Sequence, residues 1–388
     1  MANTNLANAK TAKNDEFYTQ YADIQKEINA YLDYNPDVFR DKTVLLPCDD
    51  PEWSNFTKFF AQNFQLFGLK KLISTSYAPE SKKYKMPYQP TLFETQQPYF
   101  NPDKTKTNGK IFVLERDITG DNRIDINDLE WQYLEGDGDF RSKEVTKLRD
   151  EADIIVTNPP FSLFREFVAW LMNSGKQFVI IGNQNAITYK EIFPLIKDNK
   201  IWLGKGFKGG AAHFISNYVD YATAGDHREG MIRVSGVVWF TNIDHGRRHE
   251  PLQLMTMAEN FKHSKHKEVR GRNEYVHYDN CDAIEVPFTD AIPSDYNGTM
   301  GVPISFLDKY CPEQFVIEGI TKTWYGFANK VYPEQTQVSK DGRRSKVTKL
   351  NDGATIELSE TPEAETYYIV GDKMYTQLYA RILIRKKQ

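Results

Sequence analysis

Several features that mark whole classes of protein are scarce or missing in this sequence. Only three cysteines occur among its 388 residues, Cys48, Cys281 and Cys311, and no two of them form a CxxC pair. This excludes a disulfide framework and a zinc ribbon. No run approaches the roughly 20 apolar residues that span a bilayer, and the first residues lack the apolar core of a signal peptide. We therefore expect a cytoplasmic protein without a membrane segment.

An excess of positive charge is missing as well. Lys and Arg number 49 against 53 Asp and Glu, which gives a net charge of −4, so any basic surface has to be local. The motif GxxxxGK[ST] is absent, and P-loop chemistry therefore has no support. What remains is an ordinary globular composition, 40% hydrophobic and 26% charged, with a length that suits one large α/β domain or two domains.

The first half of the chain alternates short apolar runs with helical patterns. Apolar runs predict strands at residues 43–46, 71–74, 153–157 and 178–182. Phenylalanines at helical spacing predict a helix over residues 55–67. Strands that alternate with helices indicate a parallel sheet with right-handed crossover connections. We therefore predict an α/β fold for this half.

The composition changes after about residue 245, where Gly, Asn and basic residues become frequent and helical periodicity weakens. We place a domain boundary there and predict a first domain over residues 1–247 and a second, of mixed α+β structure, over residues 248–388. Residues 78–135, which are rich in Pro, Lys and Thr, are predicted to form an irregular insertion in the first domain.

The most informative motif is Asn158-Pro159-Pro160-Phe161, which directly follows a predicted strand. Ligands of open α/β sheets bind at the carboxyl ends of strands. The exocyclic amine of a base is a poor nucleophile because its lone pair is delocalised into the ring. The Asn158 side-chain oxygen and the Pro159 carbonyl, which the proline ring holds in place, can accept both amine hydrogens, and Phe161 offers a face for the base. The alternative is a plain loop in which Asn-Pro starts a turn.

An amine held in this way needs an electrophile beside it, so we expect a site for a methyl donor. Asp49, Asp50 and Asn55 follow the first predicted strand, where carboxylates can bind a ribose or an amino group. Near the N-terminus, residues 14–20 combine polar and aromatic side chains that can grip a zwitterionic amino-acid group. Without that role, this segment is only the start of a helix, with Thr19 as a candidate N-cap.

A second acidic segment, Gly136-Asp137-Gly138-Asp139-Phe140, lies shortly before the strand that leads to Asn158. An Asp in this segment can accept a hydrogen bond from an adenine amine while Phe140 packs on the ring. Taken alone, the segment is more simply interpreted as an Asp-Gly turn.

Basic residues cluster mainly in the second predicted domain. Such runs are usually solvated faces, but in a Gly-rich domain beside a base-handling site they suggest phosphate contacts. The residues that we predict to bind DNA are Lys262, Lys265, Lys267, Arg270, Arg272, Arg343, Arg344 and Lys346.

One further pattern has the spacing of a calcium-binding loop. Its candidate ligands are Asp117, Thr119, Asp121, Asp125 and Asp128. Asn122 replaces the invariant Gly, and the twelfth ligand is Asp rather than Glu. We favour a turn-rich acidic loop here and predict no metal-binding residues.

Together these segments resemble the EcoRI-type adenine-specific DNA methyltransferases. The matching segments lie in the family's order at residues 14–20, 47–56, 136–142, 155–165, 182–190 and 379–384. The resemblance implies an α/β fold with a Rossmann-like methyltransferase sheet and a C-terminal DNA-recognition domain. It also implies transfer of a methyl group from S-adenosylmethionine to N6 of an adenine flipped out of duplex DNA. Residues 47–51 stand where methyltransferases at large have a Gly-rich donor loop.

The resemblance assigns roles to individual residues. The expected catalytic residues are Asn158, Pro159, Pro160 and Phe161. The expected cofactor-binding residues are Phe17, Tyr18, Thr19, Pro47, Asp49, Asp50, Asn55, Asp137, Asp139, Phe140 and Asn158. A monomer is expected, acting in a restriction-modification system with a cognate endonuclease or as a phage-borne or solitary enzyme. Methylation of N4 of cytosine, methylation of a protein glutamine, and an inactive DNA-binding relative are the alternatives.

Overall fold

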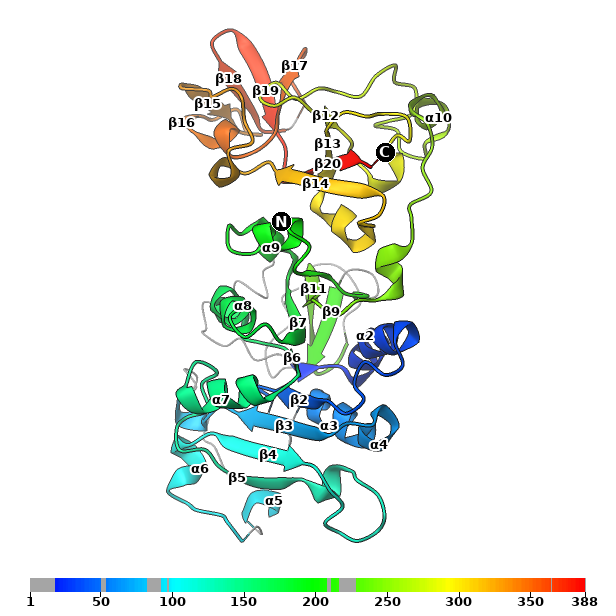
Figure 1. Cartoon of the computed structure of the whole chain (residues 1–388). Helices are drawn as coiled ribbons and strands as arrows, with labels where there is room; N and C mark the ends of the chain where they lie inside the picture. The colour runs from blue at the N-terminus through cyan, green and yellow to red at the C-terminus, as the bar shows by residue number, and fades with distance from the viewer. Residues whose placement is uncertain are drawn as a thin grey trace. The chain divides into compact units, whose positions relative to one another are not determined.

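The computed structural model describes residues 18–49, 54–81, 92–95, 98–207, 211–215, 228–363 and 365–387. The chain divides into two compact units, which Figure 1 draws in full. Unit 1 comprises Met1–Asn185 and Ile201–Gly246, and unit 2 comprises Ala186–Lys200 and Arg247–Gln388. The main part of unit 2 begins at Arg247, one residue before the predicted start of the second domain at residue 248. Unit 2 also includes residues 186–200, which the sequence pattern placed in the first domain.

Unit 1 is built on an eight-stranded sheet in the order β5-β4-β3-β2-β6-β7-β11-β8. Its strands are β2 (Thr43–Leu46), β3 (Lys71–Ser76), β4 (Lys110–Leu114), β5 (Glu130–Tyr133), β6 (Ile154–Thr157), β7 (Gln177–Asn183), β8 (Trp202–Leu203) and β11 (Val237–Thr241). The four central strands, β3, β2, β6 and β7, run parallel, as predicted. Antiparallel strands extend the sheet at both edges.

Helices cover both faces of this sheet, as Figure 1 shows. On one face lie α2 (Tyr21–Tyr34), α3 (Asn55–Gln62) and α4 (Phe64–Phe67), and on the other lie α7 (Lys143–Glu151) and α8 (Phe164–Met172). Every residue of β2 and β6 is therefore buried, whichever face its side chain points to. Continuous apolar runs are typical of parallel strands covered in this way.

The helix predicted over residues 55–67 is two helices, α3 and α4, that meet at Asn63. The Asn63 side chain donates a hydrogen bond to the Phe59 carbonyl (2.8 Å), and such bonds compete with a regular helix. The phenylalanines of both helices still form one aromatic cluster. The Phe60 ring lies 5.5 Å from Phe39 and 6.1 Å from Phe67.

Part of the segment predicted as an irregular insertion is regular. β4 and β5 lie within residues 78–135 and add an antiparallel pair to the sheet beyond β3. The single-turn helices α5 (Leu92–Thr95) and α6 (Lys104–Thr107) lie in the same stretch. An ion pair between Lys110 Nζ and Glu94 Oε2 (2.9 Å) joins the start of β4 to α5, with both side chains less than 5% exposed. The prediction of an irregular insertion rested on the many Pro, Lys and Thr residues of this stretch, a composition that does not reveal the pairing of β4 and β5.

A separate antiparallel sheet brings the N-terminal segment into unit 1. It consists of β1 (Tyr18–Thr19), β9 (Ala211–Ile215) and β10 (Met231–Ser235), in the order β1-β9-β10. Thr19 of β1 pairs with Phe214 of β9. The backbone of β1 is therefore fixed by a strand almost 200 positions further along the chain.

Strands make up most of the regular secondary structure in the described part of unit 2. One sheet has the order β12-β13-β20-β14, with β12 (Ile284–Glu285), β13 (Met300–Pro303), β14 (Phe315–Ile320) and β20 (Arg381–Lys386). The other has the order β16-β15-β18-β19-β17, with β15 (Gln335–Val338), β16 (Arg344–Val347), β17 (Thr355–Leu358), β18 (Tyr367–Val370) and β19 (Lys373–Gln377). Its α-helices are α9 (Phe193–Lys197) and α10 (Met257–His263).

Helix α9 explains why residues 186–200 belong to unit 2. The Phe193 ring is fully buried and contacts Tyr325 and Trp324 edge-on, at centroid distances of 5.5 and 6.2 Å. Trp324 Nε1 also donates to the Thr188 carbonyl (3.3 Å). Tertiary contacts of this kind leave no local signal in the sequence.

The aromatic cluster of unit 1 provides a test of the fold. Phe60 is fully buried, whereas Leu66, six residues later, is 77% exposed. We expect Phe60→Ala to lower the free energy of unfolding by about 3–5 kcal/mol, because it removes the buried ring and leaves a cavity. Leu66→Ala should change it by less than about 0.5 kcal/mol. Urea unfolding followed by circular dichroism measures both, and equal effects would contradict the packing described.

Candidate functional site

The carboxyl ends of β2 and β6 lie side by side in the middle of the parallel strands. Val44 and Leu45 of β2 pair with Ile154 and Ile155 of β6. From β2 the chain crosses outward to β3, and from β6 it crosses in the opposite direction to β7. Such a reversal of strand order leaves a crevice between the two crossovers, which is where open α/β sheets bind ligands. Residues 47–49 and the Asn158 motif both begin at this point.

The segment after β2 turns sharply at Cys48. Its φ angle is +70°, in the left-handed region that glycine adopts easily and other residues avoid. The turn lets the Asp49 N–H donate to the Thr75 carbonyl of β3 (2.9 Å). The Ser74 hydroxyl in turn donates to the Asp49 carbonyl. Residues 47–49 are thus held against the end of β3 by one backbone hydrogen bond and one from the Ser74 side chain.

The Asp49 side chain points inward and is 6% exposed. Its Oδ1 accepts a hydrogen bond from the Ser54 hydroxyl (2.8 Å), and its Oδ2 lies 2.6 Å from Oγ1 of Thr157. Ser54 also caps α3 by accepting the Phe56 N–H (3.1 Å). Asp49 therefore connects the end of β2, the start of α3 and the end of β6.

Thr19 contacts two other predicted site residues, Asn55 and Asn158. Nδ2 of Asn158 donates to Oγ1 of Thr19 at 3.4 Å, and Nδ2 of Asn55 donates to the Thr19 carbonyl at 2.8 Å. The structure thus brings together residues 19, 55 and 158, which belong to β1, α3 and the loop after β6. Tyr18 precedes Thr19 in β1 and is half-buried.

The rest of the Asn158 motif forms the passage from β6 to α8. Pro159 is buried, and Pro160 is half-buried and accepts the Leu163 N–H through its carbonyl (3.0 Å). Phe161 is half-buried and packs against the core of unit 1 on one side. Phe161 lies four positions after the end of β6, and part of the residue's surface remains exposed.

The Gly136–Phe140 segment, residues 136–140, lies at the carboxyl end of β3. Gly138 has a φ of +82°, and a Cβ there would stand 2.2 Å from the Ser76 carbonyl oxygen, so this close approach requires glycine. The Asp137 carbonyl accepts the Ala78 N–H (2.7 Å), and its half-buried side chain accepts the Asp139 N–H (3.1 Å).

Asp139 and Phe140 face other parts of unit 1. Arg141 binds the Asp139 carboxylate through Nε (2.9 Å) and Nη2 (2.7 Å), and these hydrogen bonds lower the pKa of Asp139. Arg141 also donates to Glu166 of α8 (2.8 Å). The Phe140 ring is 3% exposed and contacts Phe167, also of α8, edge-on at 4.9 Å. In this structure both residues secure the segment to α8.

Two predicted cofactor-binding residues, Phe17 and Asp50, lie outside the described residues. Conversely, the sequence pattern did not single out Ser54, Ser74 and Thr157. Each is a small hydroxyl residue at the end of a strand or the start of a helix next to a predicted motif. That position is the one signal that could have identified them.

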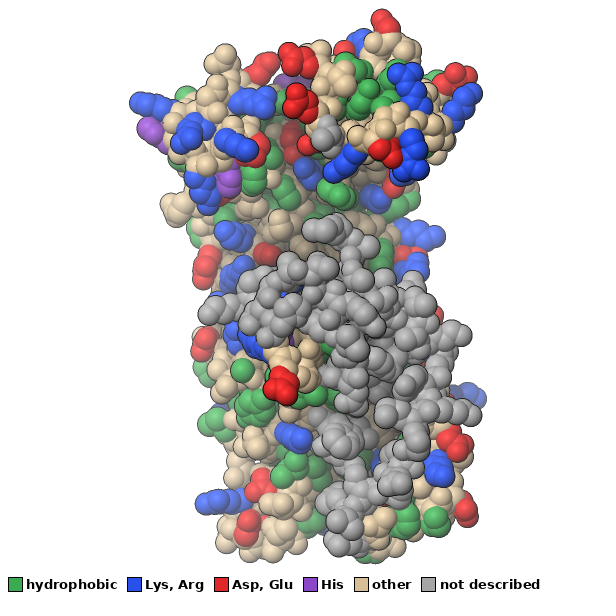
Figure 2. Space-filling model, turned by 180° about the vertical axis from the view of Figure 1, so that it is seen from behind, with side chains coloured by type: hydrophobic (Ala, Val, Ile, Leu, Met, Phe, Trp, Pro, Cys, Tyr) green, Lys and Arg blue, Asp and Glu red, His purple; other side chains and the backbone are tan. Residues whose placement is uncertain are grey.

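The predicted DNA-binding residues are all in unit 2 and exposed. Figure 2 shows Lys and Arg side chains on the surface of this unit, with Asp and Glu among them. Lys265 pairs with Asp290 (2.7 Å) and Arg343 with Asp341 (2.6 Å). The other six predicted DNA-binding cations form no salt bridge within the described part of the chain: Lys262, Lys267, Arg270, Arg272, Arg344 and Lys346.

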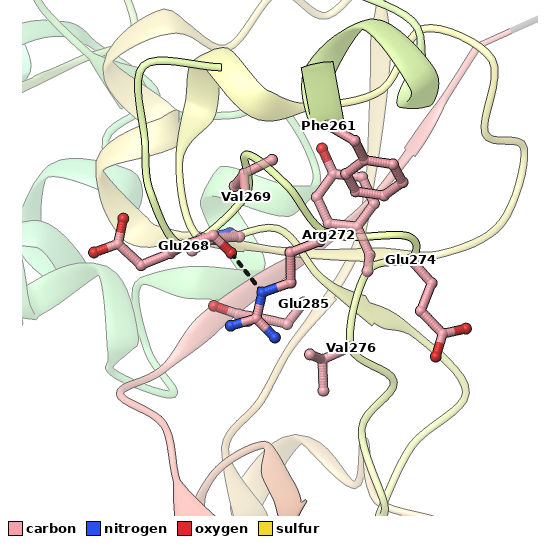
Figure 3. A pocket seen from close by; sticks show the side chains of 9 residues that line it. Phe261, Glu268, Val269, Arg272, Glu274, Val276 and Glu285 are labelled. Atoms are coloured by element: carbon pink, nitrogen blue, oxygen red, sulfur yellow. Dashed lines mark hydrogen bonds between the residues drawn. The ribbon is translucent and has the colours of Figure 1, made fainter. Parts of the chain in front are cut away.

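Arg272 lies at a small pocket of unit 2, shown in Figure 3. Its Nε donates to the Glu268 carbonyl (3.1 Å). Phe261, Val269 and Val276 supply apolar side chains, while Glu274 and Glu285 add carboxylates. The neighbouring acidic groups make this part of the surface less basic than the sequence cluster suggested.

The loop with calcium-like spacing is held by hydrogen bonds to its own backbone. Asp117 accepts the N–H groups of Gly120 (2.6 Å) and Asn122 (2.8 Å). Asp128 accepts those of Ile118 (2.9 Å) and Asp125 (3.0 Å). Among the described residues, no group of three or more His, Cys, Asp or Glu side chains is arranged to hold a metal ion. The same residues include no helix long and apolar enough to cross a membrane.

Comparisons with known proteins agree along nearly the whole chain. A family model described as "Adenine-specific methyltransferase EcoRI" matches residues 5–387. Type II methyltransferase M.EcoRI of Escherichia coli is 42% identical over 80% of this chain and 87% of its own length. Type II methyltransferases M.MpnI of Mycoplasma pneumoniae and M.MgeORF184P of Mycoplasma genitalium are 34% and 31% identical, over 79% of this chain and 82% and 83% of their own lengths. No solved structure matches the chain.

The left-handed conformation of Cys48 gives a prediction. A residue with a Cβ is strained there by about 1–2 kcal/mol relative to glycine, and a β-branched residue is strained more. We expect Cys48→Gly to be at least as stable as the natural protein and Cys48→Val to be less stable by about 1–2 kcal/mol. Thermal unfolding of the two variants measures the difference. A more stable Cys48→Val variant would show that the turn is not left-handed.

Proposed function

Because the chain belongs to the EcoRI family of adenine-specific methyltransferases and is a site-specific DNA adenine methyltransferase, we propose that the crevice at β2 and β6 is its active site. The methyl donor is S-adenosylmethionine, and the acceptor is N6 of an adenine flipped out of duplex DNA. The sheet of unit 1 is the Rossmann-like catalytic core, and unit 2 recognises the DNA target. The single observation that carries the proposal is the convergence of Thr19, Asn55 and Asn158 at this crevice.

The residues around the crevice suit the donor's chemistry. S-adenosylmethionine carries a sulfonium and an ammonium group, a ribose and an adenine, which call for carboxylates, hydrogen-bond acceptors and an apolar wall. Asp137 supplies a half-buried carboxylate at the end of β3, and Thr19 and Asn55 supply polar groups from the opposite side of β2. Asp139 and Phe140 hold the Asp137 segment to α8, so we assign them a supporting role.

The residues of the Asn158 motif are assigned to binding of the flipped adenine, which accepts the methyl group. The Asn158 side-chain oxygen and the Pro159 carbonyl accept the two amine hydrogens of the flipped adenine, and the exposed part of the Phe161 ring stacks on the base. The N6 lone pair then attacks the donor's methyl carbon. The N–C bond forms as the C–S bond breaks, its electron pair stays on sulfur, and water takes the proton that N6 loses. Orientation and desolvation supply most of the rate enhancement, up to about 7–11 kcal/mol in well-aligned cases.

DNA binding is assigned to the exposed cations of unit 2. Arg344 and Lys346 are two positions apart in β16 and so share one face of this strand. β16 is the edge strand of its sheet, and its cations are free of salt bridges within the described part of the chain. A cation without an ion pair can bind a phosphate without first losing a partner. We further propose that one monomer acts on one strand at a time.

The catalytic assignment predicts a selective loss of activity. We expect Asn158→Ala and Phe161→Ala each to lower kcat by about 100-fold or more, because both act on the orientation of the reacting amine. Affinity for duplex DNA, measured by fluorescence anisotropy, should stay within a few-fold of that of the natural protein. Asn127→Ala, at an exposed position of unit 1, is the control.

The product of the reaction is measured by mass spectrometry of nucleosides from DNA incubated with the protein and labelled S-adenosylmethionine. We expect N6-methyladenine and no N4-methylcytosine. Full activity of either Asn158→Ala or Phe161→Ala would remove the catalytic assignment while leaving family membership intact.

The DNA-binding assignment predicts a change in salt dependence. We expect Arg344→Gln and Lys346→Gln each to weaken DNA binding and to reduce the slope of log K against log salt by about 0.9 for the lost phosphate contact. Lys373→Gln is the matched control, since Lys373 lies in the same sheet but pairs with Glu357 (2.8 Å). Titrations at several salt concentrations measure the slopes. An unchanged slope in both variants would exclude phosphate contacts at β16.

A further inference from the structure

We propose that Thr157 is a positioning residue of the methyl-transfer reaction, because its hydroxyl fixes the donor-side loop to the strand that carries Asn158. The inference rests on the proposed function. Thr157 is the last residue of β6 and the direct neighbour of Asn158, and it is fully buried.

Two acceptors surround the Thr157 hydroxyl, and both belong to the loop after β2. They are the Pro47 carbonyl and Oδ2 of Asp49 (2.6 Å). The hydroxyl has one hydrogen, so whichever acceptor receives it, the contact is made to residues 47–49. A buried threonine needs only one backbone carbonyl to satisfy it. The Thr157 hydroxyl has two acceptors near it, a carbonyl and a carboxylate, and both belong to a loop about 110 positions earlier in the chain.

Asp49 extends this link to a third segment. Its other oxygen accepts from Ser54, which begins α3, the helix that carries Asn55. Only 6% of Asp49 is exposed, so we assign it mainly to the support of the surrounding segments. Thr157, Asp49 and Ser54 therefore form a buried chain of hydrogen bonds between the acceptor side at Asn158 and the donor side at residues 47–55.

The functional consequence concerns relative placement. In-line transfer requires the amine and the methyl carbon to be held about 3–3.5 Å apart, and a misplacement of about 1 Å can cost 100-fold in rate. Without the hydroxyl, the direct hydrogen-bonded link between the loop after β2 and the strand that leads to Asn158 is lost. Transfer should then suffer although each site can still be occupied.

The test is Thr157→Val, which removes the hydroxyl at nearly constant volume, beside Thr157→Ser, which keeps it. We expect kcat to fall by about 10- to 100-fold in Thr157→Val and to recover to within about threefold in Thr157→Ser, with DNA affinity unchanged in both. Thr241→Val is the matched control. Thr241 is an equally buried threonine of the same sheet whose hydroxyl donates to the Phe178 carbonyl (2.7 Å), and its variant should keep the natural kcat even if it is less stable.

Three outcomes would overturn the inference: a Thr157→Val kcat within about twofold of the natural value, a kcat loss in Thr241→Val of equal size, or no recovery in Thr157→Ser. If Thr157→Val does not fold, Ser54→Ala gives a second test at the other carboxylate oxygen, and an unchanged kcat there also overturns it. The natural protein is assayed in parallel. Failure of the natural protein to methylate adenine would refute the proposed function, whereas equal activity of natural and variant proteins refutes only the role of Thr157.

Discussion

The parallel pairing of β2 with β6 is the constraint on which the rest of unit 1 depends. Because these two strands are neighbours and their crossovers leave in opposite directions, their carboxyl ends lie together at a reversal of strand order, the place where open α/β sheets bind ligands. The pairing sets the distance between the loop of residues 47–49 and the Asn158 motif. Helices on both faces bury every residue of the two strands, so the scaffold beneath the crevice is apolar and closely packed.

On this scaffold, small polar side chains hold the loop of residues 47–49 in place. Cys48 adopts the backbone conformation that a glycine would otherwise supply, and the strain is tolerated because the flanking residues are tied to β3 and β6. Strained backbone of this kind is concentrated at functional sites, where the surrounding structure determines it. Asp49, Ser54 and Thr157 then join the segments through hydroxyl–carboxylate bonds that water does not reach. At the end of β3, Gly138 packs closely against the Ser76 carbonyl and so fixes the Gly136–Phe140 segment there.

The sequence predicted those parts of the structure that have a local signal. The apolar runs located β2, β3, β6 and β7, and the predicted position of Asn158 directly after a strand is confirmed. The prediction failed where tertiary contacts decide the outcome. β4 is a strand because it pairs with β3 and buries Lys110 against Glu94, and β5 is one because it pairs with β4; neither has a strand pattern of its own. The contacts of the Gly136–Phe140 segment also depend on tertiary structure. Phe140 is buried against α8, and Arg141 joins Asp139 to Glu166 of the same helix, about 25 residues further along the chain.

The chain crosses between its two units three times, after Asn185, after Lys200 and after Gly246. The units are consequently interwoven in sequence rather than arranged in series, and no single cut separates them. A fragment that ends at Gly246 would include α9 but lack Trp324 and Tyr325. Phe193 of α9 would then lose the aromatic rings that it contacts. For the same reason, a chimera that exchanges unit 2 between relatives has to transplant two stretches of polypeptide together, since α9 forms its hydrophobic contacts with the more distant one.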